Sequence, residues 1–298
     1  MSELIDYDEF GLFEDNAREA GLAYPGPPTV RRAAVDLGDG RALSALVWGT
    51  APAEFVFLHG GGQNAHTWDT VALALGRPLV AIDLPGHGHS DAGRHGSRHL
   101  ESNAADVATA IRELAPAAKV VVGMSWGGMT LLALYLHAPD LVRTGVLVDV
   151  TPGAGGPGAS AIVEFLNGPE TFPNFDEILA RTVEYNPTRT ESSLRRGILH
   201  NARQLPDGSW VWRHRRFAEP DWRPDFSPYW DVLSSVEVPL LLVRGMRPQS
   251  VVDDADEAEF LARCRTGSVI HVQEAGHSVQ GDTPVELARI LAAFADQR

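Results

Sequence analysis

Residues 119–128 have the sequence Lys119-Val120-Val121-Val122-Gly123-Met124-Ser125-Trp126-Gly127-Gly128, and this stretch decides the fold. The β-branched run at 120–122 is typical of a buried parallel strand, and residues 126–137 have the composition of a helix. A serine between glycines at such a junction matches the tight turn called a nucleophile elbow. Because the flanking glycines carry no side chains that would clash, we expect the Ser125 hydroxyl to project alone above a sheet edge.

Outward from this stretch, short apolar strands alternate with helices. Strands are predicted at 55–58, 79–82, 120–122 and 144–150, with helices at 65–75, 102–114 and 126–137. The alternation resumes with strands at 239–244 and 269–272 and helices at 253–265 and 284–295. Two further strand-like runs, 29–37 and 41–48, are joined by a hairpin signal. This order favours an α/β protein whose mostly parallel central sheet has helices on both faces.

Three regions follow from this pattern. Residues 1–28 are predicted to be an N-terminal extension with a short helix. Residues 29–152 and 236–298 would form the α/β core, and residues 153–235 an inserted, mostly helical cap. The Gly/Pro-rich run 151–158 is interpreted as a linker between them. A cap at this point would cover the carboxyl ends of the strands, where ligands bind in such sheets.

Composition narrows the class of partners. The chain has 298 residues, 39 acidic and 25 basic, and a net charge of −14, which argues against a nucleic-acid partner or an anionic membrane surface. The single cysteine, Cys264, cannot form an intramolecular disulfide. The acidic N-terminus lacks the features of a signal peptide, and no run approaches the ~18 apolar residues of a membrane span. We therefore expect a soluble cytoplasmic protein with a small-molecule substrate and no membrane partner; its oligomeric state stays open.

A catalytic serine needs a base, and the best candidate is His277. It lies in Glu274-Ala275-Gly276-His277-Ser278, between a predicted strand and the last predicted helix. Such a loop would lie at the same edge of the sheet as Ser125. The alternative interpretation of His277 is a surface-loop histidine.

An oxyanion needs two N–H donors. The run His59-Gly60-Gly61-Gly62 follows a predicted strand, and its glycines let backbone N–H groups approach a substrate oxygen. The N–H of Gly61 is predicted as one donor, with Gly62 as a near alternative. The N–H of Trp126 is the second, at a helix N-terminus whose dipole favours negative charge.

The acid that orients the histidine has two candidate positions. The segment after the strand at 239–244 holds no acid until Asp253 and Asp254, which have the pattern of helix N-terminal charges. Asp149 ends the predicted strand after the nucleophile strand, and burying a carboxylate there is costly without a partner. A histidine N–H would supply that partner. Asp149 is therefore the first choice, and Asp253 or Asp254 the alternative.

These motifs together resemble the α/β-hydrolase fold superfamily over residues 29–298. The segment around Asp149 resembles a subgroup of serine esterases whose acid follows the sixth strand, some 24 residues beyond the serine. The resemblance implies an α/β-hydrolase fold with a helical cap, a Ser125–His277–Asp149 triad and no cofactor. It rests on four motifs: His59-Gly60-Gly61-Gly62, Asp83-Leu84-Pro85-Gly86-His87-Gly88-His89-Ser90, Gly123-Met124-Ser125-Trp126-Gly127-Gly128 and Ala275-Gly276-His277.

Serine at the elbow argues against the family members that cleave carbon–halogen bonds or epoxides, because those use aspartate as nucleophile. The predicted function is hydrolysis of an ester, thioester, lactone, amide or activated C–C bond in a small, largely apolar substrate. Two alternatives stay open: a non-catalytic small-molecule receptor on the same scaffold, and a perhydrolase or acyltransferase.

The pocket is predicted less directly. Gly62, Trp126 and Met129 are candidates to contact substrate, although Trp126 and Met129 could equally pack in the core. The cap is rich in aromatic residues that suit either a pocket roof or the cap's own core. Three of its arginines, Arg213, Arg215 and Arg216, could hold a substrate carboxylate or be solvated. His95 and His99 have metal-ligand spacing, but an exposed turn explains them better, so no metal is expected.

Overall fold

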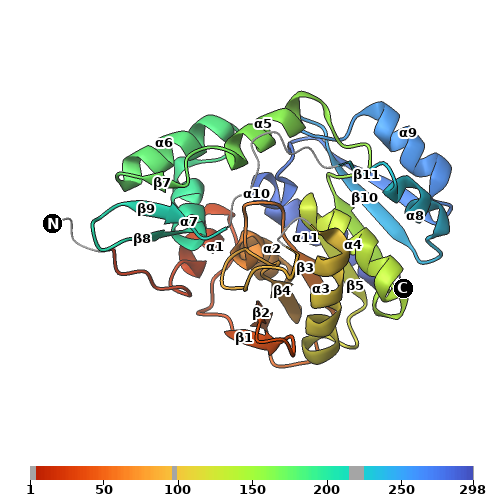
Figure 1. The fold of residues 1–298 in the computed structure, drawn as a ribbon, viewed down its shortest axis with the longest axis horizontal. Coiled ribbons are helices and arrows are strands. Elements are labelled where there is room, and N and C mark those ends of the chain that lie inside the picture. Colours follow the sequence, from red (N-terminus) through yellow and green to blue (C-terminus); the bar gives the residue numbers. More distant parts are fainter. Residues whose placement is uncertain (1–4, 96–98, 215–224, 298) are drawn as a thin grey trace.

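The computed structural model describes residues 5–95, 99–214 and 225–297. Its centre is an eight-stranded sheet with the order β1-β2-β4-β3-β5-β6-β10-β11 (Figure 1). β1 and β2 pair antiparallel, as do β2 and β4, and the other neighbours are parallel. The strands are β1 (Val30–Asp36), β2 (Ala42–Trp48), β3 (Phe55–Leu58), β4 (Leu79–Ile82), β5 (Val120–Met124), β6 (Gly145–Val148), β10 (Leu240–Gly245) and β11 (Gly267–Val272).

Two hydrophobic clusters cover the two faces of the sheet. Successive residues of β3 alternate between them, with Val56 and Leu58 in one cluster and Phe55 and Phe57 in the other, as a pleated strand requires. One face is covered by α3 (Leu100–Leu114), α4 (Trp126–His137), α8 (Tyr229–Ser235) and α9 (Asp254–Arg263). The other is covered by α1 (Phe13–Glu19), α2 (Asp69–Leu75), α10 (Val279–Asp282) and α11 (Pro284–Asp296). The short 3₁₀ turns are η1 (Ala65–Trp68) and η2 (Pro139–Leu141).

The inserted region has its own small core and is not purely helical. Its helices are α5 (Gly156–Leu166), α6 (Phe175–Tyr185) and α7 (Glu191–Asn201). The expectation of a mostly helical cap omitted a three-stranded antiparallel sheet, which is formed by β7 (Thr171–Phe172), β9 (Trp210–Trp212) and β8 (Ala202–Gln204). Side chains from these helices and strands form a third hydrophobic cluster, which is separate from the two beside the central sheet.

Two boundaries differ from the sequence analysis. The expected linker 151–158 is shorter, because α5 begins at Gly156 and includes a proline in its first turn. Proline is tolerated there because the first N–H groups of a helix have no intrahelical partner. The helix α8, assigned to the cap, packs against α4 and α9, and its Leu233 is fully buried in the core.

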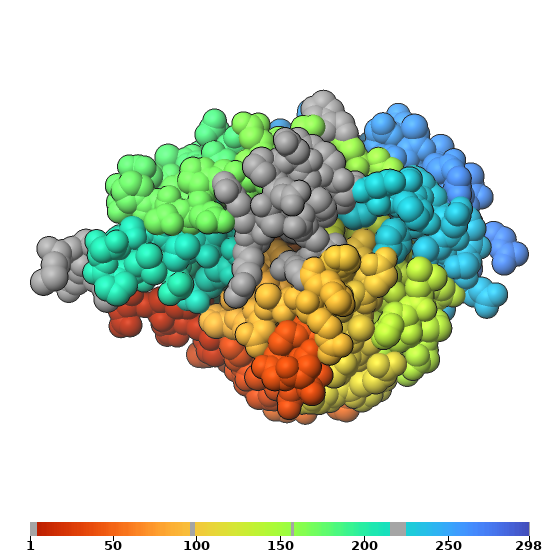
Figure 2. Space-filling view, viewed as in Figure 1, coloured from red at the N-terminus to blue at the C-terminus, as the bar shows by residue number. Residues whose placement is uncertain are grey.

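The N-terminal segment contacts both the α/β core and the inserted region. Phe13 in α1 packs against Trp48 of β2, with ring centroids 5.0 Å apart. The N–H of Ile5 donates to Gln204 Oε1 in the cap strand β8 at 2.8 Å. Figure 2 shows the N-terminal residues in red directly beside the teal surface of the cap strands. Within the described residues, no helix is long and apolar enough to cross a membrane.

Candidate active site

The parallel register brings four strand ends together. Leu58 of β3 lies opposite Gly123 of β5, and Val148 of β6 lies opposite both Met124 of β5 and Val243 of β10. The loops that follow these strands therefore begin at one edge of the sheet, as the carboxyl ends of parallel strands must.

Ser125 lies in the turn between β5 and α4 with φ 50° and ψ −117°. A positive φ is uncommon for a non-glycine residue and costs backbone strain. The neighbouring glycines make the turn possible. A Cβ on Gly127 would lie 2.2 Å from the carbonyl oxygen of Leu58, and one on Gly123 would lie 2.4 Å from that of Gly127. The helix α4 can therefore begin directly against the strands only with glycine at both positions.

The structure brings His277 and Asp149 together. Nδ1 of His277 lies 2.9 Å from Oδ2 of Asp149, and both side chains are largely buried. A carboxylate only accepts hydrogen bonds, so Nδ1 carries the proton and Nε2 of the neutral ring keeps its lone pair. This is the tautomer that a general base beside a serine needs.

Three further donors hold the Asp149 carboxylate. The N–H of Gly245, the hydroxyl of Ser250 and the N–H of Val251 donate to it at 2.9, 2.6 and 3.1 Å. All three donors lie at the end of β10 or in the loop after it, where the sequence holds no acid before Asp253. That segment supplies donors to the carboxylate of Asp149 instead. The backbone of Asp149 also has a positive φ of 47°, which is uncommon for aspartate.

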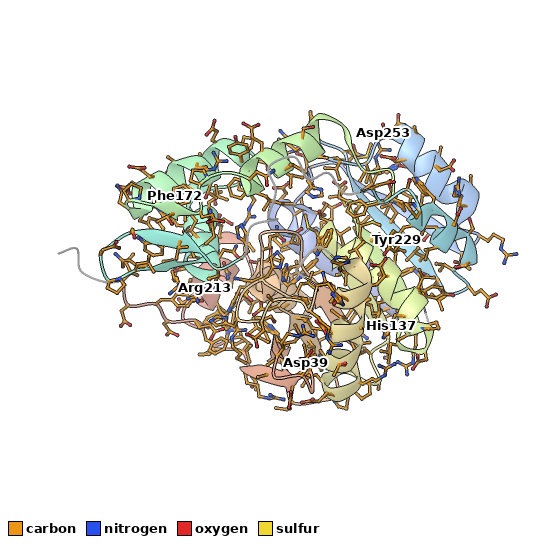
Figure 3. The ribbon with its side chains drawn as sticks, in the orientation of Figure 1. Asp39, His137, Phe172, Arg213, Tyr229 and Asp253 are labelled. Atoms are coloured by element: carbon orange, nitrogen blue, oxygen red, sulfur yellow. The ribbon has the colours of Figure 1, made fainter. Side chains whose placement is uncertain are left out.

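The alternative acids lie elsewhere. Asp253 is the N-cap of α9, where its carboxylate accepts from the N–H of Asp256 at 2.8 Å in a capping box. Figure 3 shows Asp253 beside α9. The side chain of Asp254 is 94% exposed and pairs with Arg244 at 2.8 Å. Both carboxylates therefore lie at the N-terminus of a helix, as their sequence pattern indicated.

The glycine loop after β3 is fixed by His59. Its Nε2 accepts from the N–H of Leu84 at 2.9 Å, and its Nδ1–H donates to the carbonyl of Gly60 at 2.8 Å. The N–H of Gly60 donates to Gln63 Oε1 at 3.1 Å. Within the described residues no hydrogen bond uses the N–H of Gly61, which leaves this predicted oxyanion donor available.

One cavity of about 900 Å³ joins these groups. Ser125, His277, Gly61 and Gly62 line it, together with residues of α5, α7 and α10. Trp126 and Met129 are not among the lining residues in the described part of the chain. Both are buried in the core, with Trp126 packed 5.9 Å from the ring of Phe226. Met124, which was not predicted from the sequence to contact substrate, lines the cavity instead.

The other features singled out from the sequence lie away from the cavity or outside the described residues. Arg213 lies over the ring of Tyr7 and donates to the carbonyl of Ala202 (Figure 3). Arg215 and Arg216 lie outside the described residues. His95 and His99 have ring centroids 5.6 Å apart but belong to no group of three metal-ligating side chains among the residues described.

A largely buried cluster of ionisable groups reaches the cavity wall through His66 and His200, and it was not predicted from the sequence. We call Glu9, His66, Asp69 and His200 the buried histidine cluster. His66 contacts Asp69 through Nδ1 at 2.8 Å and Glu9 through Nε2 at 3.0 Å. Burial alone would lower the pKa of His66, but the two carboxylates outweigh it and raise this pKa to about 9. Burial and the charge of His66 hold the pKa of His200 well below its ordinary value.

The ligand atoms of His66, Asp69 and His200 lie within 4.8 Å of one another, which invites a test as a metal site. The two imidazole rings stack in parallel, 3.8 Å apart with an interplanar angle of 7°. Their in-plane lone pairs therefore do not converge on one ion at the ~2.0–2.1 Å that zinc requires. Both nitrogens of His66 already contact carboxylates. The donor set, in this arrangement, does not fit a transition metal.

Comparison with known proteins identifies the class of protein to which this chain belongs. A profile described as the alpha/beta hydrolase family matches residues 55–290. The chain therefore belongs to the alpha/beta hydrolase family, and it is an enzyme of the hydrolase class. This confirms the fold and the family expected from the sequence.

Particular relatives follow from the same comparison. The chain is 44% identical to the esterase Rv0045c of Mycobacterium tuberculosis over 99% of its own length and 98% of that protein. A solved structure of that esterase superposes with a TM-score of 0.86 at 42% identity, covering 98% of this chain and 100% of the other. The structure of an E-2-(acetamidomethylene)succinate hydrolase, 24% identical, superposes with a TM-score of 0.80 over 90% of this chain and 100% of the other, and shows the shared fold alone.

Proposed function

We propose that this protein is a serine esterase that hydrolyses small carboxylic esters through an acyl-enzyme. The observation that carries the proposal is the 2.9 Å contact between His277 and Asp149 in the cavity that Ser125 also lines. The similarity to an esterase over nearly the whole chain supports the same reaction class. Thioesters, lactones, amides and activated C–C bonds are the further substrates of this chemistry.

In the proposed reaction, Nε2 of His277 takes the proton of the Ser125 hydroxyl as its oxygen attacks the ester carbonyl. The N–H groups of Gly61 and Trp126 donate to the oxyanion that forms. The imidazolium then protonates the leaving alcohol, and an acyl-enzyme remains. His277 next activates a water, which releases the acid and restores the serine. Asp149 keeps Nδ1 protonated and stabilises the imidazolium in both halves of the reaction.

The test uses a fluorophosphonate probe, which reacts with activated serines, and p-nitrophenyl esters. Wild-type protein should be labelled at Ser125 and should release p-nitrophenol. Ser125→Ala should lose labelling and about 10⁴–10⁶-fold in kcat. Ser234→Ala, an exposed serine whose hydroxyl contacts only the carbonyl of Trp230, is the matched control and should keep both.

Two other functions on this scaffold are outcomes of the same experiment. A folded wild-type protein that neither reacts with the probe nor turns over esters would be a small-molecule receptor. Product analysis with an added alcohol or with peroxide identifies the third case. Transfer of the acyl group to the added nucleophile, in preference to water, would make the protein an acyltransferase or a perhydrolase.

A further inference from the structure

Arg189 occupies a distinctive place in the cavity wall. It lies in the cap loop between α6 and α7 and lines the same cavity as Ser125 and His277. Its guanidinium lies against α10, the short helix that follows His277. A Cβ on Gly281 of α10 would lie 2.2 Å from an Arg189 guanidinium nitrogen, so glycine there leaves the room that the side chain fills.

This guanidinium has no counter-ion among the residues that the structure describes. It donates to the hydroxyl of Ser193, and its Nε is buried with no hydrogen-bond partner. In the described parts of the chain, no carboxylate lies within ion-pair distance of Arg189. Burial lowers its pKa, and the more distant charges of Asp282 and Glu19 only partly offset this.

The two acids nearest to Arg189 are engaged elsewhere. Asp282 accepts from the hydroxyl of Thr188 and from the N–H of Gly276, both at 2.9 Å. Glu19 accepts from the guanidinium of Arg196 and from the hydroxyl of Thr190. Neither carboxylate can turn to Arg189 without losing these contacts.

A second arginine in the same wall shows what a structural role requires. Arg196 also lines the cavity, but it pairs with Glu19 and donates to Asn16 Oδ1 and Ser192 Oγ, both at 2.7 Å. Its charge is compensated within the protein. A partly buried cation without such compensation is costly, unless a ligand supplies the anion.

We propose that Arg189 binds a carboxylate of the substrate, so that the preferred substrates are esters carrying a free carboxylate on the acyl or the alcohol side. The planar guanidinium fork matches a carboxylate in a bidentate geometry. Ile162, Phe165 and Leu166 of α5 also line the cavity, and their apolar side chains suit the hydrocarbon part of such a molecule. This inference rests on the proposed esterase function and names its substrate class.

The test compares charged esters with matched neutral ones. On the acyl side the pair is mono-p-nitrophenyl adipate and p-nitrophenyl heptanoate. On the alcohol side it is 4-(hexanoyloxy)benzoate and its methyl ester. For each pair the ratio of kcat/KM, charged over neutral, is measured in wild type, Arg189→Gln, Arg189→Lys and Arg195→Gln. Arg195 is the control, since it lies exposed on α7 and pairs with Glu191 outside the cavity.

In Arg189→Gln the ratio should fall by about 10–100-fold for at least one pair, because a charged hydrogen-bonded contact is lost. Arg189→Lys keeps the charge but not the fork and should fall by a smaller factor. Arg195→Gln should leave both ratios unchanged. If Arg189→Gln also loses activity on the neutral esters, the inference is tested by the charged-over-neutral ratio of kcat/KM in Arg189→Lys. A lowered ratio supports the inference, and an unchanged ratio overturns it.

Unchanged ratios for both pairs in the Arg189 variants would overturn the inference while leaving the esterase function intact. Failure of wild type on all four esters, with no labelling of Ser125, would instead overturn the proposed function. The two failures are therefore distinguished by whether the wild-type protein hydrolyses the neutral esters.

Discussion

Two buried histidine–aspartate pairs of nearly equal geometry each contribute their histidine to the cavity wall. His277 lies 2.9 Å from Asp149, and His66 lies 2.8 Å from Asp69. They differ at the second ring nitrogen. In His66 it contacts Glu9, whereas among the described residues His277 has no second carboxylate.

This difference separates a base from a structural ion pair. A histidine between two carboxylates is held as an imidazolium and has no lone pair with which to take a proton. A histidine with one carboxylate keeps a basic nitrogen, and His277 shares its cavity with a serine in a strained turn. A short contact between histidine and aspartate is therefore insufficient to assign a catalytic role; the partner of the other nitrogen decides.

Loss of either aspartate should affect activity very differently in the two pairs. Asp149→Asn would present an amide N–H to Nδ1 of His277, favour the wrong tautomer and lower kcat by about 10³–10⁴-fold. Asp69→Asn should change kcat by no more than a few-fold, because His66 takes no part in the proposed reaction. The measurement is steady-state hydrolysis of a neutral p-nitrophenyl ester.

Asp253→Asn is the control for charge, since asparagine also caps helices well. It should leave kcat unchanged. Equal losses of kcat in the Asp149 and Asp69 variants would contradict the different roles proposed for the two histidine–aspartate pairs. A large loss of kcat in the Asp253 variant would mean that Asp253, at the start of α9, is the acid that orients His277.

The two pairs also differ in what the sequence could predict. Ser125 and Asp149 directly follow strands whose apolar composition identifies them, and parallel topology brings such strand ends to one edge. The position of His277, between the last strand and the last helix, follows in the same way. The order of elements, together with the cost of burying an unpaired carboxylate at Asp149, therefore favoured a contact between His277 and Asp149, although the two residues are 128 positions apart.

No such rule brings Glu9 to His66 or Arg189 to Gly281. These contacts join the N-terminal segment and the loop between α6 and α7 to the short helices η1 and α10, and their positions depend on side-chain packing between those parts. Met129 illustrates the same limit at close range. It lies four residues after Ser125 on a helix buried all round, and the sequence could not tell whether it lines the cavity or packs in the core.

A smaller effect concerns the pH dependence of stability, which the buried histidine cluster should control. The pKa of His66 is raised from its ordinary 6.5 to about 9, so the folded state binds more protons than the unfolded state between these values. The contribution of His66 to stability is then fully present below pH 6.5 and falls by about 3 kcal/mol as pH rises through 9. Chemical denaturation between pH 6 and 10 measures this loss.

Glu9→Gln should flatten that dependence, because it removes one of the two carboxylates that raise the pKa of His66. Glu14→Gln is the matched control, since Glu14 is exposed and pairs only with Arg18 on the surface of α1. The same slope in wild type and Glu9→Gln would contradict the assignment of His66 as an imidazolium held by Glu9.

A helix cap outside the cavity should have a small effect on stability and none on activity. Asp253 caps α9 through the N–H of Asp256, and the N–H of Asp253 donates to the Asp256 carboxylate in return. Asp253→Ala removes the cap and should cost about 1 kcal/mol, which lowers Tm by about 2 °C in a chain of this size. Its kcat should equal that of wild type, because the carboxylate touches no group of the cavity. Calorimetry and ester hydrolysis on the same sample test both parts, and a fall in kcat with unchanged Tm would mean that this carboxylate acts in catalysis and not as a helix cap.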